Sequence, residues 1–145
     1  MKNERDLNYW IDLWEKQENG RRNEQEFWDS RADFFNRKVF TDKKVGSNIV
    51  ERLKSKNRLT KDMKVLDIGC GPGKHTLPMA QEVGRVTALD ISEKMLDYLE
   101  QNMKSTNIMN IDPINLDWKD ADLKQLNWLK RFDLVFASMT PGVFN

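Results

Sequence analysis

The residue types that could bind a small polar ligand are concentrated around one short stretch of the sequence. Asp67 is followed by glycines at positions 69, 71 and 73, and Asp90 lies 21 residues after the first of these glycines. Glycines let a ligand approach the backbone closely because they have no Cβ atom. Carboxylates accept hydrogen bonds from hydroxyl and amino groups. The pattern therefore predicts a binding site for a molecule that carries such groups, for example a ribose.

The elements that must position these residues are a strand, a loop and a helix. The strand is predicted from an apolar run of the kind found in parallel sheets, Val65, Leu66 and Ile68. The helix is predicted from apolar residues at helical spacing after the last glycine, Leu77, Ala80 and Val83. In open α/β sheets, a loop between such a strand and helix lies at the carboxyl end of the strand, where ligands bind.

Two classes of cofactor compete for such a loop. The dinucleotide fingerprint requires a third glycine three positions after the second, and Lys74 occupies that position here. The observed pattern, an acid followed by three alternating glycines, resembles motif I of the class I S-adenosylmethionine-dependent methyltransferases. The resemblance continues through Asp90, through Asp117 and Trp118, and through the apolar segment 132–137, so it covers about residue 41 to the end.

The resemblance implies that S-adenosyl-L-methionine is the cofactor and S-adenosyl-L-homocysteine the product. The implied cofactor-binding residues are Asp67, Gly69, Cys70, Gly71, Gly73, Asp90, Ile91, Asp117, Trp118 and Ser138. In the family, the acid before the glycines interacts with the cofactor's amino group, and the acid after the second strand accepts the ribose hydroxyls. The acid after the third strand meets the adenine amino group beside an apolar neighbour. The catalytic residues are not identified.

Several of these residues have alternative interpretations that involve no ligand. Backbone amides of the glycine loop could satisfy Asp67, and Asp90 could be an ordinary loop aspartate. Asp117 could cap a helix that follows it. Cys70 is expected to serve through its small size in a crowded turn rather than as a nucleophile, and His75, the single histidine, is expected to begin a helix near the pocket.

The resemblance also implies the fold, an α/β Rossmann-like three-layer α/β/α sandwich whose parallel strands follow the order 3-2-1-4. Pro113 in the third strand agrees with this order, because proline is tolerated at the edge of a sheet. Residues 1–40 are predicted to form a helical leader, which either packs against the fold or covers the cofactor as a lid. Residues 41–145 are predicted to form the methyltransferase domain. The family's sheet has three more strands, so the chain is interpreted as the N-terminal, cofactor-binding part.

The helices and strands are predicted from apolar spacing and capping residues. Helices are predicted at 4–18, 23–37, 42–56, 74–83, 92–103 and 123–129, the third capped by Thr41 or Asp42 and the fifth by Ser92. Strands are predicted at 65–68, 85–89, 109–115 and 132–137. The fourth strand is continuously apolar, so its free edge is expected to support self-association.

Composition narrows the classes of partner and location. The 145 residues have a net charge of +1 and contain no polybasic stretch, so we expect no binding to nucleic acid. The single cysteine excludes an internal disulfide and a cysteine-rich metal site. The sequence has no secretory signal and no apolar run of the roughly 20 residues that a membrane helix needs, so we expect no membrane contact and a cytoplasmic location.

The predicted function is methyl transfer to a small-molecule acceptor that the sequence does not identify. The segment after the fourth strand, Ala-Ser-Met-Thr-Pro at 137–141, differs from the Asn-Pro-Pro-Tyr type associated with methylation of nucleobase or amide nitrogens. A non-catalytic cofactor-binding or interaction module is an alternative interpretation. A fragment of a nicotinamide-binding oxidoreductase is a third.

Overall fold

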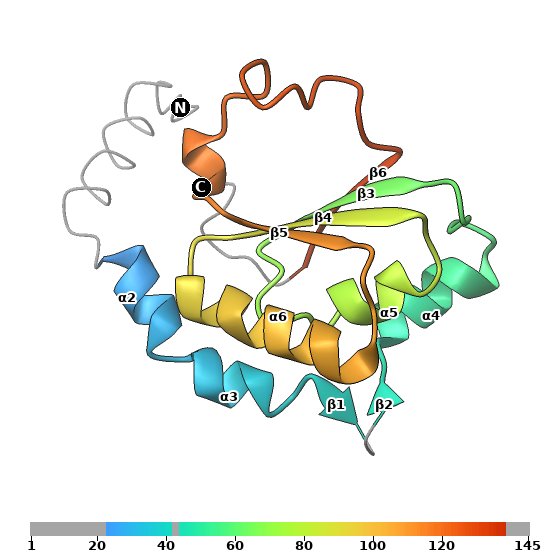
Figure 1. Cartoon of the computed structure of the whole chain (residues 1–145). Coiled ribbons are helices and arrows are strands. Elements are labelled where there is room, and N and C mark those ends of the chain that lie inside the picture. The colour runs from blue at the N-terminus through green and yellow to red at the C-terminus, as the bar shows by residue number, and fades with distance from the viewer. Residues whose placement is uncertain (1–22, 42–43, 139–145) are drawn as a thin grey trace, which may run out of the picture.

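The computed structural model of the chain describes residues 23–41 and 44–138 (Figure 1). Its main sheet consists of four strands, β3 (Lys64–Ile68), β4 (Arg85–Asp90), β5 (Ile111–Asn115) and β6 (Leu134–Ala137). All neighbouring strands are parallel, and their order across the sheet is β5-β4-β3-β6. This arrangement confirms the predicted order 3-2-1-4 and the Rossmann-like α/β fold. The helix predicted at 4–18 lies outside the described residues.

Strand β3 lies in the interior of the sheet because it pairs on both sides. Its residue Asp67 aligns with Ala88 of β4 and with Phe136 of β6. The last four residues of β3 are buried, as the apolar run predicted. Strand β5 occupies one edge of the sheet, where Pro113 aligns with Ala88, so the edge position expected from the proline is confirmed.

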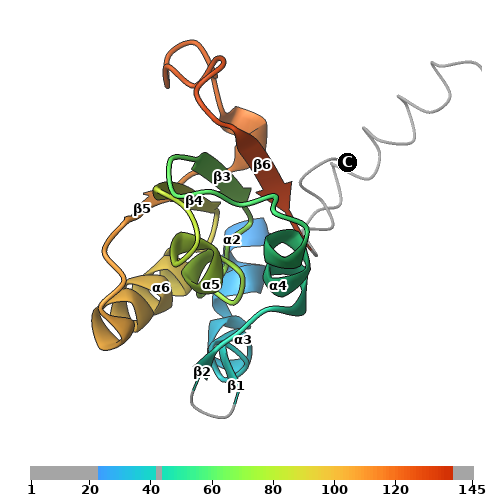
Figure 2. The same cartoon turned by 90° about the vertical axis from the view of Figure 1, so that its right-hand side faces the viewer.

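Helices cover one face of the sheet, as Figures 1 and 2 show. In chain order they are α2 (Glu24–Asp29), α3 (Ala32–Asn36), α4 (Asn48–Ser55), α5 (Thr76–Ala80) and α6 (Glu93–Thr106). The two leader helices, α2 and α3, pack along α6. The opposite face is covered by the segment between β5 and β6, which contains one short 3-10 helix, η1 (Trp118–Asp120).

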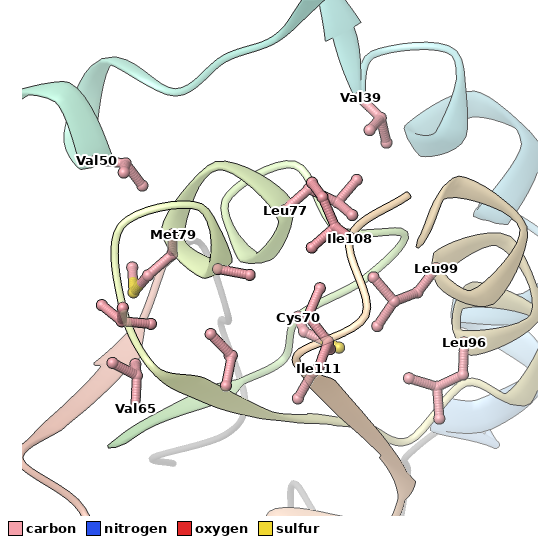
Figure 3. Close-up of a cluster of buried hydrophobic side chains, with 14 residues drawn as sticks. Val39, Val50, Val65, Cys70, Leu77, Met79, Leu96, Leu99, Ile108 and Ile111 are labelled. Atoms are coloured by element: carbon pink, nitrogen blue, oxygen red, sulfur yellow. The ribbon is translucent and has the colours of Figure 1, made fainter. Parts of the chain in front are cut away.

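Two apolar clusters hold these layers together. The larger lies between the helices and the sheet (Figure 3), and its fully buried members include Val65, Leu77, Met79, Val86 and Leu99. The smaller lies on the opposite face and consists of Leu66, Ile68, Leu89 and Trp128, with partly buried neighbours from the segment 114–132. Side chains of β3 therefore alternate between the two clusters, which explains why the strand is apolar on both faces.

The structure corrects the predicted start of the third helix. Residues Phe40–Thr41 form strand β1 and Lys44–Val45 form strand β2, and the two pair antiparallel. The helix α4 therefore begins only at Asn48, and its cap is Ser47, whose hydroxyl accepts a hydrogen bond from the amide of Val50 at 3.3 Å. A serine followed by a helical run satisfies the capping rule as well as the threonine at 41 does, so the sequence alone could not separate them.

Two further helix predictions were wrong in detail. The single helix predicted at 23–37 is divided into α2 and α3 at residues 30 and 31. The helix predicted at 123–129 is a series of turns, with Asn127 and Lys130 in the left-handed region at φ values of 55° and 54°. Asp122 accepts hydrogen bonds from the amides of Lys124 and Gln125, which starts a single turn that Asn127 then ends.

Among the described residues, no helix is both long enough and apolar enough to cross a membrane.

Candidate functional site

A cavity of about 400 Å³ opens at the carboxyl ends of the main strands. Each strand of the main sheet contributes residues from its carboxyl end to the cavity lining. These residues are Gly69 and Cys70 after β3, Leu89 and Asp90 of β4, Leu116 and Asp117 after β5, and Ser138 after β6. Its volume lies within the range of small-molecule sites, about 300–1,000 Å³. The cavity therefore occupies the position where open α/β sheets bind ligands.

The structure brings eight of the ten predicted site residues to this cavity. They are Gly69, Cys70, Gly71, Asp90, Ile91, Asp117, Trp118 and Ser138. The other two, Asp67 and Gly73, are outside the cavity lining that the described residues form. Both are buried.

The glycine loop has a backbone that residues with a side chain adopt rarely. Gly69, Gly71 and Gly73 have φ values of 70°, 54° and 100°. A Cβ atom on Gly73 would lie 2.7 Å from Cδ1 of Leu99, because the loop passes close to helix α6. The alternating glycines are thus required first by the backbone conformation and by the packing of the loop.

Hydrogen bonds to strand β4 fix the loop at the cavity. The amides of Gly69 and Cys70 both donate to the carbonyl oxygen of Leu89, at 2.7 and 3.0 Å. The amide of Gly71 donates to Oδ2 of Asp90 at 2.8 Å. The loop amides are therefore engaged within the chain, and the ends of β3 and β4 form one connected unit.

Asp90 is the carboxylate at the centre of this unit. Its Oδ1 accepts a hydrogen bond from the amide of Ser92 at 2.9 Å, so each carboxylate oxygen already holds one backbone amide. Burial raises the pKa of Asp90, and the hydrogen bonds from Ser92 and Gly71 oppose this effect. An ionised carboxylate offers about four lone-pair sites. Asp90 can thus accept further hydrogen bonds on the side that faces the cavity.

Asp67 is buried, with 2% of its surface exposed, beneath the same loop. Its Oδ2 accepts a hydrogen bond from the hydroxyl of Thr76 at 2.7 Å. Burial raises the pKa of Asp67 to about 7, with a smaller contribution from the charge of Asp90. The partner seen here is a side chain at the start of α5, whereas the alternative interpretation proposed backbone amides of the loop.

Asp117 caps a short helix and also lines the cavity, so its position agrees with both interpretations that the sequence left open. Its Oδ1 accepts a hydrogen bond from the amide of Lys119 at 3.0 Å, so it caps η1, and it also lines the cavity. Nearby, Asn115 donates to the carbonyl oxygens of Asp90 and Ile91, at 3.1 and 2.9 Å. This amide side chain holds the end of β4 to the end of β5 and so fixes the wall formed by Ile91.

His75 and Cys70 are the potentially reactive groups in the lining. Nδ1 of His75 lies 2.7 Å from Oγ of Ser47, and its ring packs edge-on against Phe136 at a centroid distance of 5.6 Å. Burial, with a smaller effect of Lys74, lowers the pKa of His75. Burial raises the pKa of the Cys70 thiol well above its ordinary value, so it stays protonated and unreactive at neutral pH.

The family of the chain follows from a match over its second half. The family described as a methyltransferase domain matches residues 65–144, which is more than half of the chain. The chain belongs to this methyltransferase family. Class I methyltransferases use S-adenosylmethionine and have a Rossmann-like fold. The strand order observed in this chain agrees with that fold. The match begins at β3 and includes the glycine loop and Asp90.

Individual relatives of this methyltransferase domain differ in the molecules they act on. It is 27% identical to the ubiquinone biosynthesis O-methyltransferase of Pelagibacter ubique, over 77% of this chain and 46% of that protein. It is 32% identical to the 23S rRNA (uracil(1939)-C(5))-methyltransferase RlmD of Aeromonas hydrophila, over 69% of this chain and 23% of that protein. The chain therefore spans less than half the length of these curated relatives.

Among solved structures, the methyltransferase domain resembles magnesium protoporphyrin IX methyltransferase (ChlM) from Synechocystis PCC 6803 with bound SAM. The TM-score is 0.61 at 21% identity, over 83% of this chain and 62% of that chain. At this identity the likeness establishes the fold. It agrees with the Rossmann-like arrangement of strands and helices described above.

The residues present at the cavity fit the family's cofactor. Carboxylates of Asp90 and Asp117 can accept hydrogen bonds from hydroxyl and amino groups, and apolar side chains of Ile91, Leu116 and Trp118 stand beside them. No group of three or more His, Cys, Asp or Glu side chains that could hold a metal ion occurs among the described residues.

One wall of the cavity comes from the leader. The sequence alone did not predict which leader residues line the cavity. Glu24, Trp28, Phe35 and Lys38 of the leader line the cavity. Nε1 of Trp28 donates a hydrogen bond to Glu24 at 3.3 Å, and Trp28 packs against Phe35 at a centroid distance of 6.1 Å. Trp28 belongs to α2 and Phe35 to α3, so their contact depends on how the two helices pack and could not be predicted from helical spacing.

Proposed function

We propose that this chain binds S-adenosyl-L-methionine in the cavity at the strand ends and takes part in methyl transfer to a small-molecule acceptor. The observation that supports this most is the unit formed by the glycine loop and Asp90. The buried carboxylate of Asp90 lines a cavity of suitable volume while it accepts hydrogen bonds from the loop amide of Gly71 and from the amide of Ser92. The full protein's activity is part of the proposal, because the chain spans less than half of its curated relatives.

Each part of the cofactor can be assigned to residues of matching chemistry. Asp90 is proposed to accept the ribose hydroxyls, and Asp117 to accept the adenine amino group. Ile91 and Trp118 would flank the adenine ring. The amino-acid part would then lie along Gly69 and the rest of the glycine loop. Asp67 lies beneath this loop, so we assign it a supporting role rather than direct contact.

The engaged loop amides favour this cofactor over a nicotinamide dinucleotide. A pyrophosphate is bound by free backbone N–H groups at a glycine loop and helix N-terminus. Here the amides of Gly69 and Cys70 donate to Leu89, and that of Gly71 donates to Asp90. A pyrophosphate at this loop would displace those bonds and would approach the carboxylate of Asp90, which repels it.

The acceptor is proposed to approach from the end of β6. Ser138 lines the cavity there, and His75 is held beside it by Ser47 and Phe136. Methyl transfer from a sulfonium is an in-line displacement, so alignment and exclusion of water contribute more than acid–base catalysis. With a net charge of +1, the chain offers little attraction to a polyanion, which favours a small molecule over the ribosomal RNA that the Aeromonas relative methylates.

The test is the binding of S-adenosyl-L-homocysteine to Asp90→Ala and Asp90→Asn variants, measured by calorimetry. Loss of charge-assisted hydrogen bonds, each about 1.5–3 kcal/mol, should weaken binding at least about tenfold in the alanine variant. The asparagine variant keeps one acceptor oxygen but places its NH2 group against the amide of Gly71 or of Ser92, so it should weaken binding as well. Asp112→Ala is a matched control, because Asp112 pairs with Arg85 at the amino end of the strands. Unchanged affinity in a folded Asp90→Ala variant would place the ribose site elsewhere.

A further inference from the structure

The two leader helices carry a row of polar residues that contact helix α6. Asp29 ends α2, whereas Asp33 and Asn36 lie on α3, and all three side chains are hydrogen-bonded to α6 or to the residue that caps it. Their partners follow in the same order along the chain: Ser92, which caps α6, and then Tyr98 and Asn102 of α6. We call these three contacts the leader seam. The seam holds the same helices that form one wall of the cavity.

The first contact of the seam reaches Asp90 through a single residue. The hydroxyl of Ser92, which is fully buried, donates to Oδ1 of Asp29 at 2.5 Å. The amide of the same Ser92 donates to Oδ1 of Asp90 at 2.9 Å. The amide of Lys94 also donates to Asp29, at 3.3 Å. Ser92 therefore sits between two carboxylates, one from the leader and one from the proposed ribose site.

The last contact of the seam reaches the glycine loop. The side-chain amide of Asn102 donates to Oδ1 of Asn36 at 2.9 Å and to the carbonyl oxygen of Pro72 at 3.0 Å. Asn102 is 7% exposed, so these bonds are shielded from water. The two ends of the leader seam are thus attached to residues that line the cavity, Asp90 at one end and Pro72 at the other.

The middle contact is different because it faces solvent. Tyr98 and Lys94 both interact with Oδ1 of Asp33, at 2.5 and 3.2 Å, and the side chains of Lys94 and Asp33 are 47% and 56% exposed. Pairs exposed in this way contribute little to stability. Asp33 has no connection to Asp90 through Ser92, and so it provides an internal comparison for Asp29.

We propose that Asp29 is a positioning residue for the cofactor site. By accepting the Ser92 hydroxyl and the Lys94 amide, it fixes α2 against the start of α6, and the contact with Ser92 orients both Asp90 and the wall formed by Glu24 and Trp28. The inference rests on the proposed function, because its effect on binding requires the cofactor to occupy this cavity. The leader is then a fixed part of the binding site in the described structure.

The test compares three variants of the 145-residue chain by calorimetric titration with S-adenosyl-L-homocysteine. Asp29→Ala removes the acceptor and should weaken binding about tenfold, as the loss of one partly buried charge-assisted hydrogen bond does. Asp29→Asn keeps an oxygen that can accept the Ser92 hydroxyl, so its affinity should stay within about threefold of wild type. Asp33→Ala should also stay within about threefold, because its pair is exposed.

Hydrogen exchange of the Ser92 and Gly71 amides gives a second readout that does not depend on any ligand. Both amides donate to Asp90. Their exchange should accelerate in Asp29→Ala and stay near wild type in Asp29→Asn and Asp33→Ala. If wild type does not bind S-adenosyl-L-homocysteine, the proposed function fails, and the exchange data still decide the role of Asp29.

Three results would overturn the role of Asp29. The first is unchanged affinity and exchange in Asp29→Ala, and the second is an equal loss in Asp33→Ala, which would indicate general docking of the leader. The third is a loss of about tenfold in Asp29→Asn, because that variant retains the acceptor on which the argument depends. The third result remains decisive even if Asp29→Ala does not fold.

Discussion

Asp67 should make the stability of this domain fall as pH rises from the acidic range to neutrality. Its pKa in the folded chain is about 7, against an ordinary value of 3.8, because the carboxyl is buried beneath the glycine loop. A group whose pKa is raised on folding stabilises the folded state fully below its unfolded pKa. That contribution is lost as pH rises through the folded pKa. The loss therefore falls between about pH 4 and pH 7.

The magnitude follows from the two pKa values. Each pKa unit corresponds to about 1.4 kcal/mol, so moving from pH 5 to pH 8 across a folded pKa of about 7 lowers the free energy of unfolding by about 2–3 kcal/mol. Asp67→Asn removes the titration and keeps an oxygen that can accept the Thr76 hydroxyl. The variant should therefore gain about 2–3 kcal/mol relative to wild type between these two pH values.

The assay is urea unfolding of wild type and Asp67→Asn at pH 5, 6, 7 and 8. Asp90 remains in both proteins, and its raised pKa adds a loss of stability with pH to both curves. Asp112→Asn is the control, because Asp112 is paired with Arg85 and partly exposed. Parallel stability curves for wild type and Asp67→Asn across this range would show that Asp67 is already ionised in the folded state, and the reasoning from its burial would be refuted.

Two further predictions concern the loop and the sheet edge. Gly73→Ala should destabilise the fold by about 1–3 kcal/mol in urea unfolding, because φ is 100° and the added Cβ would meet Leu99 at 2.7 Å. Gly46→Ala, whose Cβ would meet nothing within 4 Å, should change it far less, and equal effects would contradict the packing argument. Val135 is 57% exposed on β6, an edge of the sheet in the described part of the chain. Val135→Lys should reduce concentration-dependent self-association in light scattering, whereas a wild type that is monomeric at all concentrations would exclude association through this edge.

Much of the fold could be predicted because local pattern and tertiary structure agree. The apolar run at Val65 and the cap at Ser92 predict β3 and the start of α6, and the strand order was implied by the family resemblance, with which the proline at 113 agrees. The glycine positions also follow, since the backbone requires positive φ at each of them. The positions of eight predicted site residues at one cavity result from the shared carboxyl edge of a parallel sheet.

The remaining features depend on contacts between distant parts of the sequence. The bond between Asp29 and Ser92 joins residues 63 positions apart, and each could equally be a solvated surface residue when seen alone. The short hairpin of β1 and β2 has too few residues for a periodic signal. At 123–129, apolar spacing predicted a helix, but the side chain of Asp122 stabilises a turn instead. The start of the third helix was missed for a related reason, because several residues could serve as its cap.

The central claim is that the cavity at the strand ends binds the methyl donor of this family. Calorimetric titration of the 145-residue chain with S-adenosyl-L-methionine, S-adenosyl-L-homocysteine and NAD tests it most directly. We expect saturable binding of the first two at one site per chain and no heat from NAD, because the loop amides are engaged by Leu89 and Asp90. Saturable binding of NAD, with no response to either S-adenosyl compound, would contradict it.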